Sequence, residues 1–179
     1  GRFDRAVALD PTLGDAFYDR GTCYLKIGNF IRGMLDFTGA LELTPAFADQ
    51  YYNKVYQVSY VVDLNRVIGE LAKIIELHPD STTAIFQRAF FYLAKTEFNK
   101  YERADLVAGI RDFDRALELN PRFVAAHVYR GFLYYKMAQI SSDDQRKAHF
   151  EKALEEYAKA LSMDPDSGIA HFLKAMCWS

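Results

Sequence analysis

The sequence predicts an all-α fold, a right-handed superhelical solenoid of stacked antiparallel helix hairpins. The first observation behind this prediction is the placement of the five prolines. Each closes a similar apolar phrase, at Pro11, Pro45, Pro79, Pro121 and Pro165, with spacings of 34, 34, 42 and 44 residues. A period in this range indicates stacked supersecondary units, because one unit cannot bury its apolar face without a neighbour. The second observation is that apolar residues recur at helical spacing between the prolines.

The prolines divide the chain into units, because proline ends a helix and disfavours helical backbone in the residue before it. We expect ten helices, the outer two incomplete, and therefore a segment of a longer protein. The expected organisation is the end of an upstream repeat, four full repeats and the first helix of a downstream repeat, at residues 1–11, 12–45, 46–79, 80–121, 122–165 and 166–179.

The third and fourth repeats exceed 34 residues by 8 and 10 residues, and the excess lies between the two helices of each hairpin. About 3.6 residues make one helical turn, so the simplest account adds roughly one turn to each helix. Ser142 and Gln145 have capping-box spacing, which predicts that a second helix begins near Ser142.

Each unit shows the same two helical faces. In the first helix, small or apolar residues such as Gly21, Val55 and Gly131 stand where another helix must approach closely. In the second helix, an aromatic or Leu residue is followed three and four residues later by apolar residues, as in Phe37 and Phe113. This pattern is typical of a helix hairpin that buries one face of each helix.

On these residues the chain resembles the tetratricopeptide repeat family, whose unit is a 34-residue helix-turn-helix. Residues 17–45 match the family's order of aromatic, Gly, Tyr, Ala, aromatic, Ala and Pro nearly throughout. The second unit departs from it, with Val55 for Gly, Val58 for Tyr and Ile74 for Ala, but it keeps the period. The resemblance spans the whole chain and implies a protein-binding role.

Composition excludes several function classes. The 22 basic and 24 acidic residues give a formal net charge of -2, without long runs of either sign, so neither nucleic acid nor an anionic membrane is an expected partner. No apolar run approaches the roughly 18 residues of a membrane span. Cys23 and Cys177 are held four units apart and are expected on buried helix faces, which favours a reducing compartment such as the cytoplasm.

Two complementary charged columns run through the repeats. One is basic and the other, nine residues before each closing proline, is acidic; together they comprise Arg20, Asp36, Lys54, Glu70, Arg88, Asp112, Arg130 and Glu156. The basic column could form a stripe that binds an acidic partner. Its match to the acidic column favours a structural ladder of ion pairs between packed helices, which specifies register more than it adds stability.

The family resemblance implies that the first helices line a concave groove that holds a partner segment. The expected partner-binding residues on this face are Tyr18, Thr22, Tyr52, Asn53, Tyr56, Tyr60, Phe86, Phe90, Tyr129, Phe132 and Tyr135. Aromatic side chains supply large contact area, so we predict an aromatic groove centred on Tyr56, Phe90 and Phe132. The alternative, in which tight curvature buries this column as additional core, stays open.

Other functions find little support in the residues. The Lys, Asn and Arg clamp with which chaperone-binding members of the family grip a C-terminal tail is absent, because Asn53 lacks its companions. No metal motif, phosphate-binding loop or nucleophile signature is present, and His127 and His171 are interpreted as core residues. We therefore expect neither catalysis nor a cofactor or metal.

The sequence thus predicts a non-catalytic protein–protein interaction scaffold that binds a protein or peptide segment in an aromatic-rich concave groove. Two alternatives remain: an architectural spacer within a larger multi-subunit assembly, and an accessory domain of a larger enzyme. A fold of this kind serves unrelated functions, so the partner cannot be named from the pattern.

Overall fold

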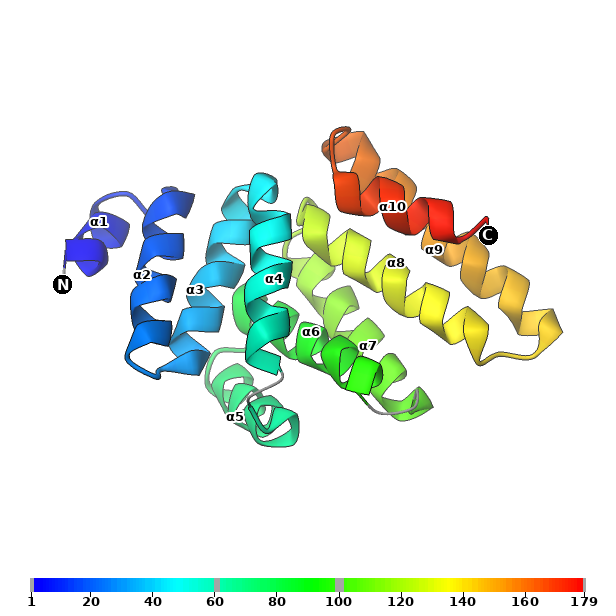
Figure 1. Ribbon diagram of the computed structural model, residues 1–179, viewed down its shortest axis with the longest axis horizontal. Coiled ribbons are helices and arrows are strands. Elements are labelled where there is room, and N and C mark those ends of the chain that lie inside the picture. Colours follow the sequence, from blue (N-terminus) through cyan, green and yellow to red (C-terminus); the bar gives the residue numbers. More distant parts are fainter. Residues whose placement is uncertain (1, 60–61, 99–101, 179) are drawn as a thin grey trace.

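The computed structural model describes residues 2–59, 62–98 and 102–178. The described residues form ten α-helices and one 3₁₀ turn, without a strand, and the helices follow one another as an all-α solenoid of hairpins (Figure 1). The elements are α1 (Arg2–Leu9), α2 (Gly14–Lys26), α3 (Phe30–Leu43), η1 (Pro45–Phe47), α4 (Ala48–Ser59), α5 (Leu64–Leu77), α6 (Thr82–Phe98), α7 (Arg103–Leu119), α8 (Val124–Gln139), α9 (Asp143–Met163) and α10 (Gly168–Met176).

The last four of the five prolines, from Pro45 to Pro165, act as helix terminators. The residue before each one, Thr44, His78, Asn120 or Asp164, has left the helical conformation, with φ between -139° and -134°. Its backbone N–H still donates to the carbonyl four residues earlier. The clash between the proline ring and the preceding residue therefore ends α3, α5, α7 and α9 at equivalent places.

The extra residues of the third and fourth repeats lengthen their helices. α2 and α3 have 13 and 14 residues, whereas α6 and α7 have 17 each, and α8 and α9 have 16 and 21. The fourth repeat thus places most of its excess in α9, where we expected an equal division. Ser142 precedes α9 as predicted, but its side chain makes no capping hydrogen bond.

Three hairpins, α2–α3, α6–α7 and α8–α9, pack tightly along their length. Close approach depends on small residues in α2 and α8. A Cβ added at Gly21 would lie 2.9 Å from the backbone oxygen of Gly33, and one added at Gly131 would lie 2.8 Å from a ring carbon of Tyr157. These glycines are therefore required where the two helix backbones or an aromatic ring come closest.

The second unit packs differently. α4 lies against α3 and α6, α5 lies against α6, and the described residues of α4 and α5 make little contact with each other. Figure 1 shows α5 below α4 and not alongside it. In this arrangement α3 packs directly on α6, and α6 is covered by α3, α4, α5, α7 and α8.

A buried polar cluster joins α3, α4 and α6 at this point. The Gln87 side-chain oxygen accepts hydrogen bonds from the Thr38 hydroxyl at 2.6 Å and the Tyr51 hydroxyl at 2.9 Å. All three residues are buried, with exposed fractions of 1% or less. Burial raises the pKa of Tyr51, so its phenol remains a hydrogen-bond donor. The cluster specifies how α4 is placed on its neighbours.

Some expectations about single residues were wrong. Cys23 is exposed and Cys177 is half-buried, so the two thiols do not share a buried helix face. His127 is buried, as expected of a core residue, but His171 is exposed. Within the described ranges, no helix combines the length and apolar character needed to cross a membrane.

Candidate binding groove

Three of the predicted groove aromatics belong to the core. Phe86, Phe90 and Tyr129 have exposed fractions of 0%, 2% and 1%. The prediction that these side chains line an open groove is therefore wrong. They belong to the core, as the alternative interpretation of the column expected. The physical reason is the packing of α6, which has helices on several sides where a regular solenoid would leave one side open.

The buried rings form one aromatic cluster between α4, α6 and α8. Phe90 meets Tyr51 and Tyr129 edge-on, at ring-centroid distances of 5.3 and 4.9 Å. Phe86 stacks on Phe123 at 4.4 Å. Edge-to-face and stacked rings at these distances are mutually attractive beyond their apolar burial. The aromatic column thus stabilises the contact of neighbouring repeats.

The other predicted residues that the structure describes lie in three different places, on α2, α8 and α4. Tyr18 is half-buried and stacks on Phe47 at 5.2 Å, and the Thr22 hydroxyl donates to the Tyr18 carbonyl. Phe132 and Tyr135 stack on each other at 6.1 Å on α8, partly exposed. Tyr52 is partly exposed and Asn53 exposed on α4. The Tyr56 side chain and all of Tyr60 lie outside the described residues.

The charged columns meet in three of the four complete repeats. Arg20 donates two hydrogen bonds of 2.7 Å to Asp36, and Arg88 does the same to Asp112. Arg130 donates to Glu156 at 2.6 and 3.0 Å. In the second repeat, exposed Glu70 pairs with Arg66 of its own helix at 3.7 Å. The predicted pair of Glu70 with Lys54 is therefore wrong. The separation of α4 from α5 explains the difference.

Glu156 is the most heavily hydrogen-bonded of these acids. It accepts from His127 Nδ1 at 2.8 Å and Lys159 at 2.8 Å in addition to Arg130. Burial by itself would raise its pKa, but the hydrogen bonds from His127, Lys159 and Arg130 outweigh burial and lower the pKa to about 2. Glu156 therefore joins α8 to α9 as a carboxylate.

An open cleft lies between the α4 side and the α10 side of the molecule. Figure 1 shows that these two helices belong to distant parts of the chain. We call it the α4–α10 cleft. Its first part has a volume of about 380 Å³ and is lined from the η1–α4 side by Thr44, Pro45, Ala46, Ala48 and Asp49, and from the α9–α10 side by Met163, Asp164, Asp166, Ser167, Gly168 and Ile169. Its second part, of about 480 Å³, continues along Tyr52, Asn53 and Phe172.

The cleft combines apolar surface with negative charge. Three carboxylates line it, from Asp49, Asp164 and Asp166, and its lining residues include no Lys, Arg or His. Asp49 and Asp166 are exposed and Asp164 is half-buried. Phe172, with 65% of its surface exposed, supplies a large apolar side chain. This arrangement suits a partner segment that carries both positive charge and apolar groups.

Sequence reasoning located part of this cleft. Tyr52 and Asn53 were predicted on the binding face and do line it. Asp49 was missed, although it occupies the same position after the proline as Asp15. Asp164 and Asp166 were missed because they flank Pro165, and residues beside a helix-ending proline are interpreted as part of a turn. Only the approach of α4 to α10 makes these residues neighbours.

The fold and the cleft define a protein of stacked helix hairpins with an open cleft between two of its repeats. Within the described part of the chain, no group of three His, Cys, Asp or Glu side chains is arranged to hold a metal ion. No family model matches the chain.

Comparison with curated proteins supports the tetratricopeptide type. The chain is 24% identical over 177 residues to the human mitochondrial import receptor subunit TOM70, covering 97% of this chain and 27% of that protein. It is 25% identical over 142 residues to the TPR repeat-containing protein MJ1428 of Methanocaldococcus jannaschii, covering 75% and 23%. It is 21% identical over 169 residues to human tetratricopeptide repeat protein 13, covering 92% and 17%.

The motif columns, the stacked hairpins and these relatives together support the tetratricopeptide-type family for this chain. The chain spans about a quarter or less of the length of these three relatives. Solenoids of stacked helical repeats form extended surfaces that are commonly used for binding.

Proposed function

We propose that this chain is a non-catalytic scaffold that holds a partner protein segment in the α4–α10 cleft. The single observation that carries the proposal is the cleft itself, walled by two first helices of different repeats and lined by exposed Asn53 and Phe172. Large exposed apolar side chains beside polar groups are typical of protein-binding surfaces.

In this proposal the partner contacts other residues than the central residues of the predicted aromatic groove. Phe90 and Tyr129 are buried, so they support the floor of the binding face while Tyr52 and Phe172 contact the partner. An extended segment suits the cleft because its two parts share Asp49, Gly168 and Ile169 and therefore form one continuous depression along α4 and α10.

Site-specific photocrosslinking tests this function. A benzoylphenylalanine replaces Asn53 in the cleft or, as a matched control, exposed Glu76 on α5. We expect discrete adducts with a cellular protein only from position 53, and we expect Phe172→Ala in the same chain to reduce them at least fivefold. Equal adducts from both positions, or adducts insensitive to Phe172→Ala, would contradict the proposal.

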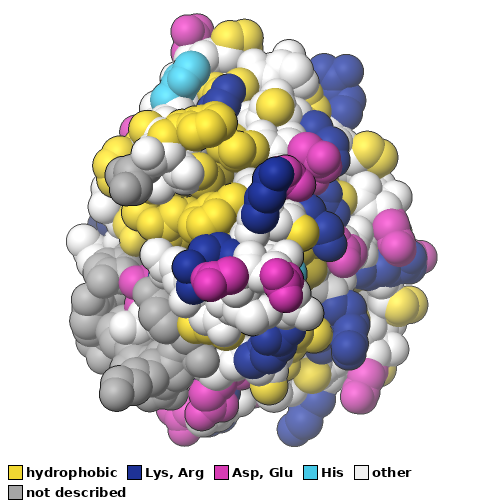
Figure 2. All heavy atoms as spheres, turned by 90° about the vertical axis from the view of Figure 1, so that its right-hand side faces the viewer, with side chains coloured by type: hydrophobic (Ala, Val, Ile, Leu, Met, Phe, Trp, Pro, Cys, Tyr) yellow, Lys and Arg dark blue, Asp and Glu magenta, His cyan; other side chains and the backbone are white. Residues whose placement is uncertain are grey.

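An architectural role is the second candidate, and one observation favours it. Hydrophobic side chains gather on the α8–α10 side of the molecule, as Figure 2 shows, and Trp178 is 75% exposed there. A surface of this kind packs against a further helix or subunit. Trp178→Ser should then weaken assembly with such a neighbour, as measured by sedimentation, while crosslinking from position 53 is unchanged.

A further inference from the structure

A small pocket that adjoins the α4–α10 cleft contains a buried hydroxyl group that has no hydrogen-bond partner among the described residues. Tyr129 of α8 has an exposed fraction of 1%, and its hydroxyl makes no hydrogen bond within residues 2–59, 62–98 and 102–178. Most buried polar groups in proteins are paired, because an unpaired one costs about 1–3 kcal/mol. An orphan hydroxyl in a pocket that adjoins an open cleft therefore points to a ligand group that pairs with it.

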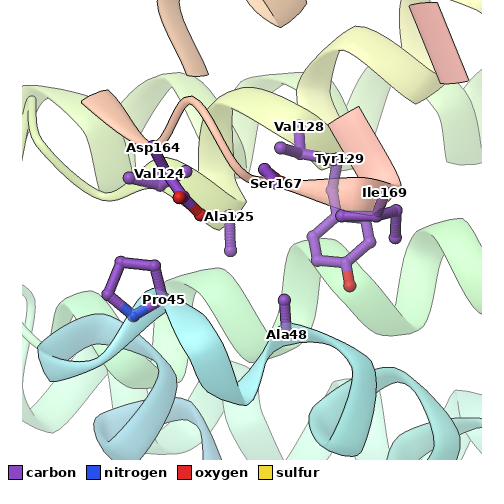
Figure 3. A pocket seen from close by; sticks show the side chains of 9 residues that line it. All are labelled: Pro45, Ala48, Val124, Ala125, Val128, Tyr129, Asp164, Ser167 and Ile169. Atoms are coloured by element: carbon purple, nitrogen blue, oxygen red, sulfur yellow. The ribbon is translucent and has the colours of Figure 1, made fainter. Parts of the chain in front are cut away.

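The space beside this hydroxyl is small and well defined. A pocket of about 10 Å³ is lined by Pro45 and Ala48 on one side and by Val124, Ala125, Val128, Tyr129, Asp164, Ser167 and Ile169 on the other. Figure 3 shows the Tyr129 ring between α8 and the start of α4, with its hydroxyl oxygen on the α4 side. A pocket of this volume holds one water-sized group.

The pocket leads into the acidic part of the cleft. Pro45, Ala48, Asp164, Ser167 and Ile169 line both spaces. The carboxylate of Asp49 is near enough that its charge contributes, after burial and the neighbouring tyrosines, to raising the pKa of Tyr129. A cation that enters from the cleft therefore passes three carboxylates before it reaches the phenol oxygen.

We infer that the α4–α10 cleft binds a lysine side chain of the partner peptide, with its ammonium group in the pocket beside the Tyr129 hydroxyl. This inference rests on the proposed function and names the chemistry of the segment. The apolar groups of Pro45, Ala48 and Ile169 contact the lysine stem, and the Tyr129 oxygen accepts a hydrogen bond from the ammonium.

Lysine fits this site better than arginine for a geometric reason. The ammonium is a compact point charge, whereas the guanidinium is a wide planar fork. A pocket of about 10 Å³ accepts a group the size of one water molecule and excludes the fork. The negative charge of Asp49, Asp164 and Asp166 compensates the cost of removing the ammonium from water.

A peptide series on the unmodified chain tests the assignment. The probes are acetylated, amidated pentapeptides with leucine on either side of a central lysine, arginine or uncharged norleucine, titrated while NMR follows the amides of Ala48, Ser167 and Ile169. We expect the lysine peptide to bind at least tenfold more tightly than the norleucine peptide and severalfold more tightly than the arginine peptide. Equal affinity for lysine and norleucine, or tighter binding of arginine, would overturn the inference.

Two matched variant pairs locate the effect. Tyr129→Phe should reduce the affinity for the lysine peptide about tenfold and leave the norleucine peptide unchanged. Tyr157→Phe is its control, because the Tyr157 hydroxyl is also buried and unpaired but does not line the cleft. Asp164→Asn should weaken lysine binding to a similar extent, and Glu76→Gln on α5 should not. A lysine preference that survives Tyr129→Phe would overturn the pocket assignment.

The outcomes separate this inference from the proposed function. Crosslinked adducts from position 53 together with no lysine preference would overturn the lysine assignment alone. Absence of adducts would overturn the function, whatever the peptides do. A free polyamine is another source of the same ammonium chemistry, so spermidine that displaces the lysine peptide at equal concentration would overturn the assignment to a peptide.

Discussion

The α8–α9 hairpin and the α4–α5 pair hold equivalent positions in the repeat but pack in opposite ways. In α8, Gly131 lets Tyr157 of α9 approach, and Arg130 binds Glu156 across the two helices. In α4 the glycine position holds Val55, and the charged positions hold Lys54 and Glu70.

A valine cannot replace a glycine whose added Cβ would already lie 2.8 Å from the facing ring. The second unit does not pack as such a hairpin: α4 lies against α3 and α6, where Tyr51 packs against Phe86 and Phe90. The α6 rings that Tyr51 contacts are buried, so the degenerate repeat differs from the regular ones in what its first helix covers.

The largest expected effect concerns acid stability of the regular hairpin. The folded-state pKa of Glu156, about 2, lies below the 4.5 of an ordinary glutamate, so its contribution is complete above pH 4.5 and is lost as the pH falls from about 4.5 to about 2. A shift of this size corresponds to about 3 kcal/mol. In urea unfolding at a series of pH values, the free energy of unfolding of Glu156→Gln should fall less steeply with decreasing pH than that of the wild type.

The control for this prediction is Glu70→Gln in the open pair. Glu70 is exposed and pairs with Arg66 at 3.7 Å, so its removal should leave the pH profile unchanged. Identical profiles for wild type and Glu156→Gln would show that Glu156 is not the group responsible.

A smaller effect is expected when the substitution of the second repeat is copied into the fourth. Gly131→Val should destabilise the chain by about 2 kcal/mol, because the added atoms overlap the Tyr157 ring. Gly69→Val on α5 is the matched control, since an added Cβ there meets nothing within 4 Å. Thermal denaturation of both variants measures the difference, and an equal effect would refute the steric account of the open pair.

The smallest effect concerns the charged columns. Arg130→Ala should cost about 1.5 kcal/mol, because Glu156 loses two hydrogen bonds but keeps His127 and Lys159. Arg66→Ala removes only the exposed pair of the second repeat and should cost less than about 0.5 kcal/mol. An unchanged unfolding midpoint for Arg130→Ala would contradict a structural role for the pair.

Much of the fold could be predicted from residues close together in the chain. The prolines terminate α3, α5, α7 and α9 because a proline acts on the backbone beside it, and the start of α9 after Ser142 follows from the same local chemistry. The charged columns could be matched because three repeats keep the same helix-to-helix distance. The expected pair of Lys54 and Glu70 was wrong because it assumed the same helix-to-helix distance between α4 and α5 of the second repeat.

The candidate site was less predictable, because its residues depend on contacts between repeats. Tyr52 and Asn53 could be assigned to the binding face from helical periodicity. The burial of Phe90 and Tyr129 could not, since the same aromatic spacing serves an open groove or a core.

The sequence by itself determined the repeat period, the helix ends before the prolines and most of the complementary charges, since each depends on local backbone chemistry or on a regular spacing. Only the tertiary structure decided that α4 separates from α5, that the aromatic column is core, and that Asp49 meets Asp164 across a cleft above Tyr129. The physical reason is that these features depend on contacts between repeats that are far apart in the chain, which no local pattern determines.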